Sequence, residues 1–154
     1  AMVELTANAL GKGFSVSDDE IKSDGISYTH RTVCHWRREH PNDALFFITG
    51  TDIFITIGKW QEWEDLFNQC NFIVVNRTGT EFAEILETIP PVLKKRVINA
   101  EDYADELYGK IILFTMDPVD VSSTEIRDQI AEAEKPGMLL DEIRKYIEKR
   151  QLYK

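Results

Sequence analysis

The sequence predicts an α/β fold with a parallel sheet, and two features carry this prediction. Three short apolar runs lie far apart in the chain, at residues 45–49, 72–76 and 111–115. None of them alternates polar with apolar residues, which is typical of strands that are covered on both faces of a parallel sheet. Segments with helical spacing separate the runs, and this repeated order of strand and helix implies parallel strands joined by crossovers.

The residues before the first apolar run predict two helices and one additional strand. We expect a helix over residues 2–10, a strand over 14–17 that runs on toward Ile21, and a helix over 28–39. Ser27 or Thr29 would cap the last of these helices, since hydroxyl side chains are favoured there. Val33 would then lie on its inner face and Arg37 on its outer face.

The residues after the first run predict the helices that join and follow the strands. We expect helices from Trp60 to Cys70, around residues 82–86, over 103–108, over 122–134 and over 139–150. Pro90 and Pro91 interrupt the less regular stretch between residues 80 and 108.

Length and composition limit the classes of protein that this chain can belong to. A chain of 154 residues with 43% hydrophobic and 29% charged residues is predicted to form one globular domain over residues 1–154. The net charge of −9 argues against a nucleic-acid-binding surface, and no apolar run approaches the roughly 20 residues of a membrane span. The two cysteines, Cys34 and Cys70, suggest cytoplasmic thiols rather than a metal-ligand cluster, and no metal site is predicted.

Gly50 and Asp52 follow the first apolar run directly. In open α/β sheets, ligands bind beyond the carboxyl ends of the strands. A glycine that admits a close backbone approach, followed by a carboxylate, therefore stands where a binding site is expected. An ordinary turn explains the same two residues, because glycine and aspartate are common in turns.

The stretch from Ser122 to Arg127 is the most specific in the chain. Ser122 and Glu125 match the capping box that starts a helix. Free backbone N–H groups and the helix dipole make such a start an anion-binding site, to which Arg127 would add a forked cation. A well-capped helix without a ligand is the alternative.

This stretch, Val121-Ser122-Ser123-Thr124-Glu125-Ile126-Arg127, resembles the I-S-S-T-x-I-R motif of the nicotinate and nicotinamide mononucleotide adenylyltransferases. Four further segments resemble motifs of that family in the same order: Ser27-Tyr28-Thr29, Phe47 to Asp52, Trp60 to Trp63, and Val74 to Gly79. The bacterial nicotinate-specific type is the most similar. The resemblance implies a Rossmann-like nucleotidyltransferase fold.

The resemblance also implies a reaction and a set of binding residues. The family transfers the adenylyl group of ATP to nicotinate mononucleotide with Mg²⁺, which gives deamido-NAD and pyrophosphate. By analogy, the ATP phosphates would be bound by Ser123, Thr124 and Arg127, and the adenosine and its ribose by Gly50 and Asp52. The nicotinate mononucleotide would be bound by Tyr28, Thr29, Trp60 and Arg77. Taken alone, Trp60 is better explained as a core or surface anchor.

One family motif is absent from the sequence. The family carries H-x-G-H after its first strand, and its two histidines stabilise the transferred phosphate. The three histidines here, His30, His35 and His40, are spaced by five residues along one helix, so we expect them to be solvated and poor ligands. The chain resembles the carboxyl-terminal two-thirds of the family, so no catalytic residue is assigned and we expect little activity from this chain alone.

Without the family's first strands, apolar sheet edges would be exposed between the strand at 14–17 and that at 45–49, which suggests a homo-oligomer or a swapped assembly. A nucleotide-binding or assembly module without catalysis is therefore the alternative function. An adenylyltransferase acting on phosphopantetheine is a further one, against which Trp60 and residues 27–29 argue. In the favoured interpretation, the helix start near Ser122 and the loop beyond Gly50 converge on one crevice.

Overall fold

The computed structural model describes residues 1–76, 82–117, 122–132, 134, 137 and 139–153. The chain forms two compact units. One unit spans Asp19–Pro118, and the other combines Ala1–Asp18 with Val119–Lys154. A single domain over residues 1–154 stays a prediction.

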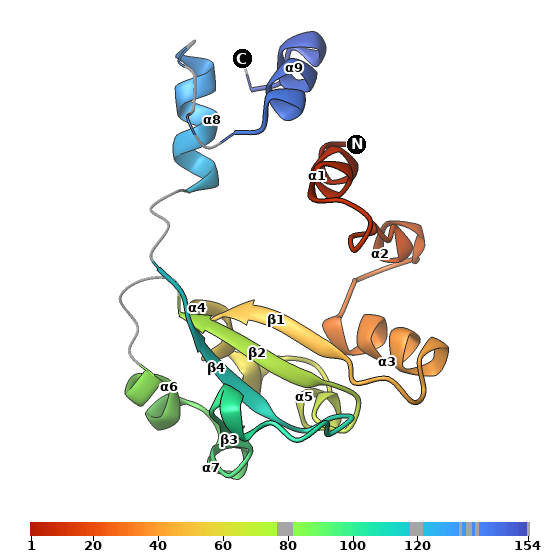
Figure 1. Ribbon diagram of the computed structural model, residues 1–154, viewed down its shortest axis with the longest axis vertical. Helices are drawn as coiled ribbons and strands as arrows, with labels where there is room; N and C mark the ends of the chain where they lie inside the picture. The colour runs from red at the N-terminus through yellow and green to blue at the C-terminus, as the bar shows by residue number, and fades with distance from the viewer. Residues whose placement is uncertain (77–81, 118–121, 133, 135–136, 138, 154) are drawn as a thin grey trace. The chain divides into compact units, whose positions relative to one another are not determined.

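A four-stranded parallel sheet forms the centre of the unit Asp19–Pro118. Its strands are β1 (Phe46–Gly50), β2 (Asn71–Asn76), β3 (Val97–Ile98) and β4 (Ile111–Thr115), in the order β1-β2-β4-β3 (Figure 1). Phe47 pairs with Phe72, and Phe72 pairs with Ile111, so these side chains share one face of the sheet. The parallel sheet predicted from the three apolar runs is confirmed, with the two-residue strand β3 added to it.

Short helices cover one face of this sheet and enclose the core. The helices of the unit are α2 (Asp19–Lys22), α3 (Thr29–Glu39), α4 (Thr51–Phe54), α5 (Trp63–Leu66), α6 (Phe82–Thr88) and α7 (Pro91–Lys94), with 3₁₀ turns at Ile57–Lys59 and Ala100–Asp102. In Figure 1, α4 and α5 lie behind the sheet. Phe54 and Leu66 from these helices are fully buried with Phe72, Val74 and Ile111 from the strands. The core therefore lies between the sheet and this helical layer.

The first strand, β1, is covered on one face only, which corrects the prediction of two covered faces. β1 is an edge strand of the described sheet, and Ile48 is 66% exposed while Phe47 packs against the core. The prediction holds for β2, where Phe72 and Val74 are fully buried. An apolar run does not distinguish an edge strand from a central one, because both pack apolar side chains on at least one face.

The predicted strand at residues 14–17 is wrong, and so is the sheet order that included it. These residues have no regular structure, and Phe14 and Val16 are 57% and 41% exposed. Alternation over four residues gives a strand only where a partner strand supplies the hydrogen bonds, and this segment is not paired with a strand of the described sheet.

Two predicted helices are also corrected. Residues 103–108 are not helical, because Asp105 adopts a left-handed conformation (φ 57°) that interrupts a helix. The helix expected from Trp60 to Cys70 is reduced to α5, since Glu62 is likewise left-handed (φ 49°). At the start of α3, neither predicted cap is used: the N-cap position is Tyr28, which makes no side-chain cap hydrogen bond.

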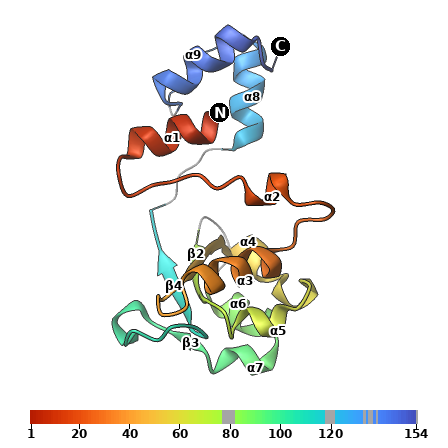
Figure 2. The same cartoon turned by 90° about the vertical axis from the view of Figure 1, so that its right-hand side faces the viewer.

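The second unit contains three helices among its described residues: α1 (Met2–Leu10), α8 (Ser123–Ala131) and α9 (Asp141–Arg150). α1 lies beside α9, as Figure 2 shows. Ile147 of α9 is buried at 5% exposure, and α1 has no buried residue. All three helices match helices expected from the sequence.

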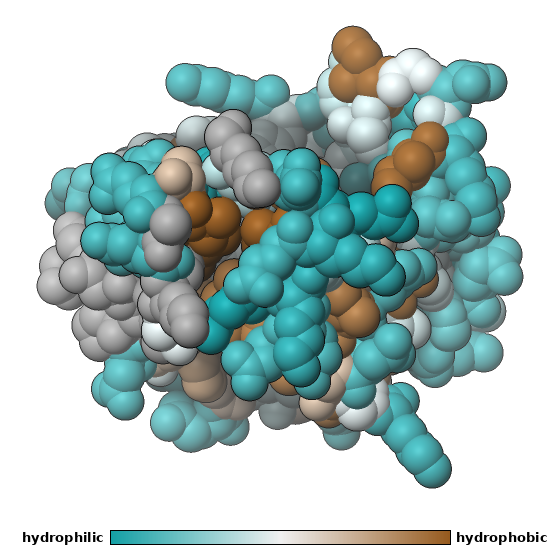
Figure 3. All heavy atoms as spheres, turned by 90° about the horizontal axis from the view of Figure 1, so that it is seen from above, coloured by the Kyte–Doolittle hydropathy of each residue, from teal (hydrophilic) through white to brown (hydrophobic). Residues whose placement is uncertain are grey.

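The surface carries polar and apolar side chains together. On the face shown in Figure 3, hydrophilic residues predominate, and hydrophobic residues are visible in separate areas between them. Within the described part of the chain, no helix combines the length and the apolar character that crossing a membrane requires.

Arg37 links α3 to two distant segments, although the sequence predicted it on the outer face of the helix. Its Nε donates to the carbonyl oxygen of Gln69 at 2.9 Å, and its Nη2 donates to that of Leu107 at 3.0 Å. Its Nη1 donates to the carbonyls of His40 and Asp43 at 2.9 and 2.7 Å. One guanidinium thus donates hydrogen bonds to carbonyl groups at the end of α3 and in two loops.

Replacing Arg37 by lysine is expected to lower the free energy of unfolding by about 1–3 kcal/mol, because one ammonium group cannot reach carbonyls on three sides. Urea unfolding followed by tryptophan fluorescence measures this, since Trp36, Trp60 and Trp63 all lie in this unit. Arg38→Lys is the control, because Arg38 is exposed and its Nε donates to the Cys34 carbonyl at 3.3 Å within the same helix. Equal losses in both variants would contradict the role of Arg37.

Candidate functional site

Gly50 and Asp52 lie at the carboxyl end of β1, as predicted. Gly50 is the last residue of β1 and Thr51 the first of α4, so strand and helix follow without a loop. Thr51 is buried at 2% exposure, whereas Asp52 is exposed. Burial of Thr51 fixes the turn, and the Asp52 carboxylate is accessible to a ligand at the edge where parallel-sheet proteins bind them.

Asn76 ends the neighbouring strand β2 at the same edge, and sequence analysis did not single it out. Gly50 pairs with Val75, so the ends of β1 and β2 lie side by side. The Oδ1 atom of Asn76 is buried and has no hydrogen-bond partner among the described residues. A buried acceptor without a partner is uncommon, and it marks Asn76 as a candidate ligand contact. Arg77, the predicted site residue that follows it, lies outside the described residues.

Tyr28 and Thr29 stand at the start of α3, beside a cleft. Tyr28 has an extended backbone, and Thr29 is the first helical residue. The cleft has a volume of about 690 Å³, and Ser27, Tyr28 and His30 contribute to its lining together with residues of α2. Tyr28 therefore presents its side chain to a space large enough for a small molecule.

Trp60 packs as an anchor in the structure. Its ring packs edge to face against the ring of Phe47, with the ring centroids 5.9 Å apart, and its Nε1 donates to Thr56 Oγ1 at 3.0 Å. The side chain is half-buried and lies against the core. Trp60 does not line the cleft that contains Tyr28.

In the other unit, the start of α8 has the predicted capping box. The Glu125 N–H donates to Ser122 Oγ, and the Ser122 N–H donates to a Glu125 carboxylate oxygen, both at 3.1 Å. The N–H groups of Ser123 and Thr124 precede the first intrahelical hydrogen bond, which Ile126 donates to the Ser122 carbonyl. Arg127 donates to Thr124 Oγ1 at 3.3 Å, and the side chains of Ser123, Thr124 and Arg127 are exposed. This helix start can accept an anion.

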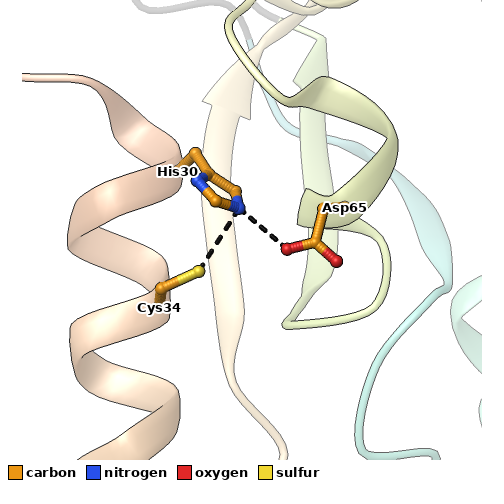
Figure 4. A group of neighbouring side chains, drawn as sticks. All are labelled: His30, Cys34 and Asp65. Carbon is orange, nitrogen blue, oxygen red and sulfur yellow. Dashed lines mark hydrogen bonds and ion pairs between the residues drawn. The ribbon is translucent and has the colours of Figure 1, made fainter.

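A cluster of His30, Cys34 and Asp65 was missed from the sequence (Figure 4). His30 Nε2 lies 2.8 Å from Asp65 Oδ2 and 3.3 Å from Cys34 Sγ. The prediction that His30 is solvated is wrong, since its side chain is only 21% exposed. The spacing of His30 and Cys34 puts both on one face of α3, but the sequence gives no sign that Asp65 of α5 faces them.

The cluster shifts the pKa values of two of its members in opposite directions. The hydrogen bond from His30 lowers the pKa of Asp65, and side-chain hydrogen bonds from Asn68 and Gln69 lower it further. Burial raises the pKa of the Cys34 thiol, and the charge of Asp65 adds to this increase. The carboxylate is therefore ionised at neutral pH and the thiol protonated.

The model of the cytidylyltransferase-like family matches residues 1–129 of the chain. A protein of Clostridium botulinum (strain Kyoto / Type A2) is 39% identical over 145 residues, which cover 92% of this chain and 66% of that protein. A protein of Clostridium acetobutylicum is 37% identical over 141 residues, covering 91% and 65%. Both bear the name "Probable nicotinate-nucleotide adenylyltransferase". The chain thus spans slightly less than two-thirds of the length of these curated relatives.

Solved structures of the Plasmodium falciparum nicotinic acid mononucleotide adenylyltransferase are similar in fold. The structures complexed with APC and with NaAD each match with a TM-score of 0.59 at 20% identity. The match covers 84% of this chain and 60% or 58% of theirs. The likeness supports the Rossmann-like nucleotidyltransferase fold implied by the sequence motifs.

Proposed function

Because the chain belongs to the cytidylyltransferase-like family, we propose that it takes part in adenylyl transfer from ATP to nicotinate mononucleotide. The products are deamido-NAD and pyrophosphate, and the reaction is a step of NAD biosynthesis. The observation that carries this proposal is the 37–39% identity, over 91–92% of the chain, to relatives named as nicotinate-nucleotide adenylyltransferases. The two free cysteines are in keeping with a cytoplasmic enzyme.

In this proposal the start of α8 binds the phosphates of ATP. The N–H groups and hydroxyls of Ser123 and Thr124 donate to phosphate oxygens, and Arg127 adds a charge-assisted pair of hydrogen bonds. Arg127 and Thr124 already share a hydrogen bond, which places the guanidinium at the first turn of the helix. The Glu125 carboxylate is engaged in the capping box, so Mg²⁺ would accompany the ATP phosphates rather than bind Glu125.

The unit that contains the sheet binds the remaining parts of the two substrates. The exposed Asp52 carboxylate accepts hydrogen bonds from ribose hydroxyls, and Gly50 admits the adenosine moiety. Tyr28 and Thr29 lie beside the pyridine carboxylate, and the half-exposed face of Trp60 stacks on the pyridine ring. Arg77 keeps its predicted role in binding nicotinate mononucleotide, and Asn76 joins the set as an acceptor at the end of β2.

Catalysis in this proposal rests on positioning and on stabilisation of charge at the transferred phosphate. The 154 residues contain no H-x-G-H sequence. Without that pair of imidazoles, fewer groups of the chain stabilise the charge that develops on the phosphate: Arg127 and the donors at the start of α8. We therefore expect these residues to bind nucleotides but to transfer adenylate slowly.

Replacing Arg127 by alanine is expected to weaken binding of ATP by about tenfold or more, because a charge-assisted bond of about 1.5–3 kcal/mol is lost. Isothermal titration with ATP and with deamido-NAD measures this. The control is Arg150→Ala in the same unit, since Arg150 lies at the end of α9 over the ring of Tyr146. No binding of either nucleotide to the unmodified chain would refute the proposed function.

Pyrophosphate release from ATP and nicotinate mononucleotide tests the expected loss of catalysis. Turnover at ordinary enzyme rates, about 1 per second or faster, would show that the absent histidines are dispensable. Binding without turnover is the expected result.

A non-catalytic assembly module is the second candidate, and the exposed apolar edge of β1 favours it. Ile48 is 66% exposed and Phe46 39% exposed on an edge strand of the described sheet. Such an edge can pair with another chain. Sedimentation equilibrium distinguishes the two functions: a stable oligomer that binds neither nucleotide would support assembly.

A further inference from the structure

We propose that His30, Cys34 and Asp65 form a zinc-binding site that links α3 to α5. This inference departs from the sequence prediction of no metal site, and it stands independently of the proposed adenylyl transfer. It rests on three side chains whose ligand atoms converge on one point.

The geometry of the cluster matches what a tetrahedral zinc ion requires. The three ligand atoms all lie within 4.8 Å of one another, with 2.8 Å between nitrogen and oxygen and 3.3 Å between nitrogen and sulfur. Zinc bond lengths of about 2.0–2.3 Å at tetrahedral angles separate ligand atoms by roughly 3.4–3.6 Å. The separations of 2.8 and 3.3 Å lie close to this range but below it, so the side chains would move slightly apart to admit the ion.

The placement of the ligands on the backbone also suits a metal. His30 and Cys34 are four residues apart on α3, so they point to the same side one turn apart. Asp65 comes from α5, which packs against α3. Hydrogen bonds from Asn68 to Oδ1 and from Gln69 to Oδ2, both at 3.2 Å, orient the carboxylate. Such outer contacts are typical of protein metal sites.

A nucleophilic Cys–His–Asp site is excluded by the same geometry. In such a site the carboxylate binds one ring nitrogen of the histidine and the nucleophile binds the other. Here Asp65 and Cys34 both face Nε2 of His30. A zinc ion at this point would instead displace the thiol proton and satisfy all three groups.

The site is accessible to an ion and leaves one coordination position open. The side chains of His30 and Asp65 are 21% and 43% exposed. His30 and Cys34 line the cleft of about 690 Å³, whose lining also includes Asp19 and Glu20. Three protein ligands leave the fourth position for water, so the ion is exchangeable rather than enclosed.

Titration of the chelator-treated chain with Zn²⁺ tests the proposal. We expect one ion per chain with a dissociation constant on the order of 1 μM or tighter. Cys34→Ser and His30→Ala are each expected to weaken binding on the order of 100-fold, since even outer-sphere partners of zinc contribute about 10- to 100-fold. Co²⁺ is the spectroscopic probe: the wild-type chain should show thiolate-to-cobalt absorption, which Cys34→Ser removes.

Two variants serve as matched controls. His40 forms a similar pair with Asp43 at 3.0 Å, and Cys70 is a buried thiol whose pKa burial raises to about 12. His40→Ala and Cys70→Ala should bind Zn²⁺ as the wild type does. The proposal is overturned if the wild-type chain binds no Zn²⁺ at micromolar concentration, if its Co²⁺ form lacks thiolate absorption, or if all four variants bind alike.

Discussion

Replacing Phe72 by alanine is expected to lower the free energy of unfolding by about 3–5 kcal/mol. Phe72 is the second residue of β2 and is fully buried. The centroid of its ring lies 4.8 Å from that of Phe67, 5.5 Å from that of Phe54 and 5.6 Å from that of Phe47. Truncation would leave a cavity between three aromatic rings that the sheet and two helices hold apart. Urea unfolding followed by tryptophan fluorescence measures the loss.

Phe114→Ala is the matched control for this prediction. Phe114 lies near the carboxyl end of β4 in the same sheet, where it pairs with Val75, but it is 50% exposed. Its truncation should lower the free energy of unfolding by about 1 kcal/mol or less, mainly through reduced strand propensity. If the two variants lost stability equally, the core would not lie on the helical side of the sheet.

Asn71→Ala is expected to cost about 2–4 kcal/mol, because it leaves the Lys110 N–H without its partner and removes one of the two hydrogen bonds that the Glu106 carbonyl accepts, the other coming from the Tyr103 hydroxyl. Asn71 is a fully buried polar residue at the start of β2. Its Nδ2 donates to the Glu106 carbonyl at 2.8 Å, and its Oδ1 accepts from the Lys110 N–H at 2.9 Å. The side chain therefore fixes the irregular segment that leads into β4.

Asn99→Ala tests whether this loss depends on burial. Asn99 Nδ2 donates to Asp102 at 3.1 Å in an exposed turn, where water can replace the bond. Its removal should change the free energy of unfolding by about 0.5 kcal/mol or less. An equally small loss for Asn71→Ala would mean that the segment 103–110 is not fixed by this residue.

The zinc and nucleotide proposals share helix α3 but use different residues. Tyr28 and Thr29 stand at its first turn, and His30 follows them directly. His30→Ala should therefore lose Zn²⁺ while keeping ATP binding, which the proposal assigns to Arg127 in the other unit. Measuring the binding of Zn²⁺ and of ATP to His30→Ala and to Arg127→Ala separates failure of one proposal from failure of the other.

The local patterns of the sequence predicted regular elements where one face of the element is apolar. The three apolar runs became β1, β2 and β4, and the capping box at Ser122 formed as expected. The same patterns failed at residues 14–17 and 103–108. A short alternation contains no information about a partner strand. At residues 103–108, the apolar spacing predicted a helix but did not reveal the left-handed conformation of Asp105.

By itself, the sequence determined the parallel α/β architecture, the family and the capping box at the helix start near Ser122. These properties depend on neighbouring residues, whose spacing the chain fixes directly. Only the tertiary structure decided that β1 is an edge strand, that Arg37 serves three segments, and that Asp65 meets His30 and Cys34. Each of these depends on contacts between residues about 25 or more positions apart, which are set by packing of the whole unit rather than by any local pattern.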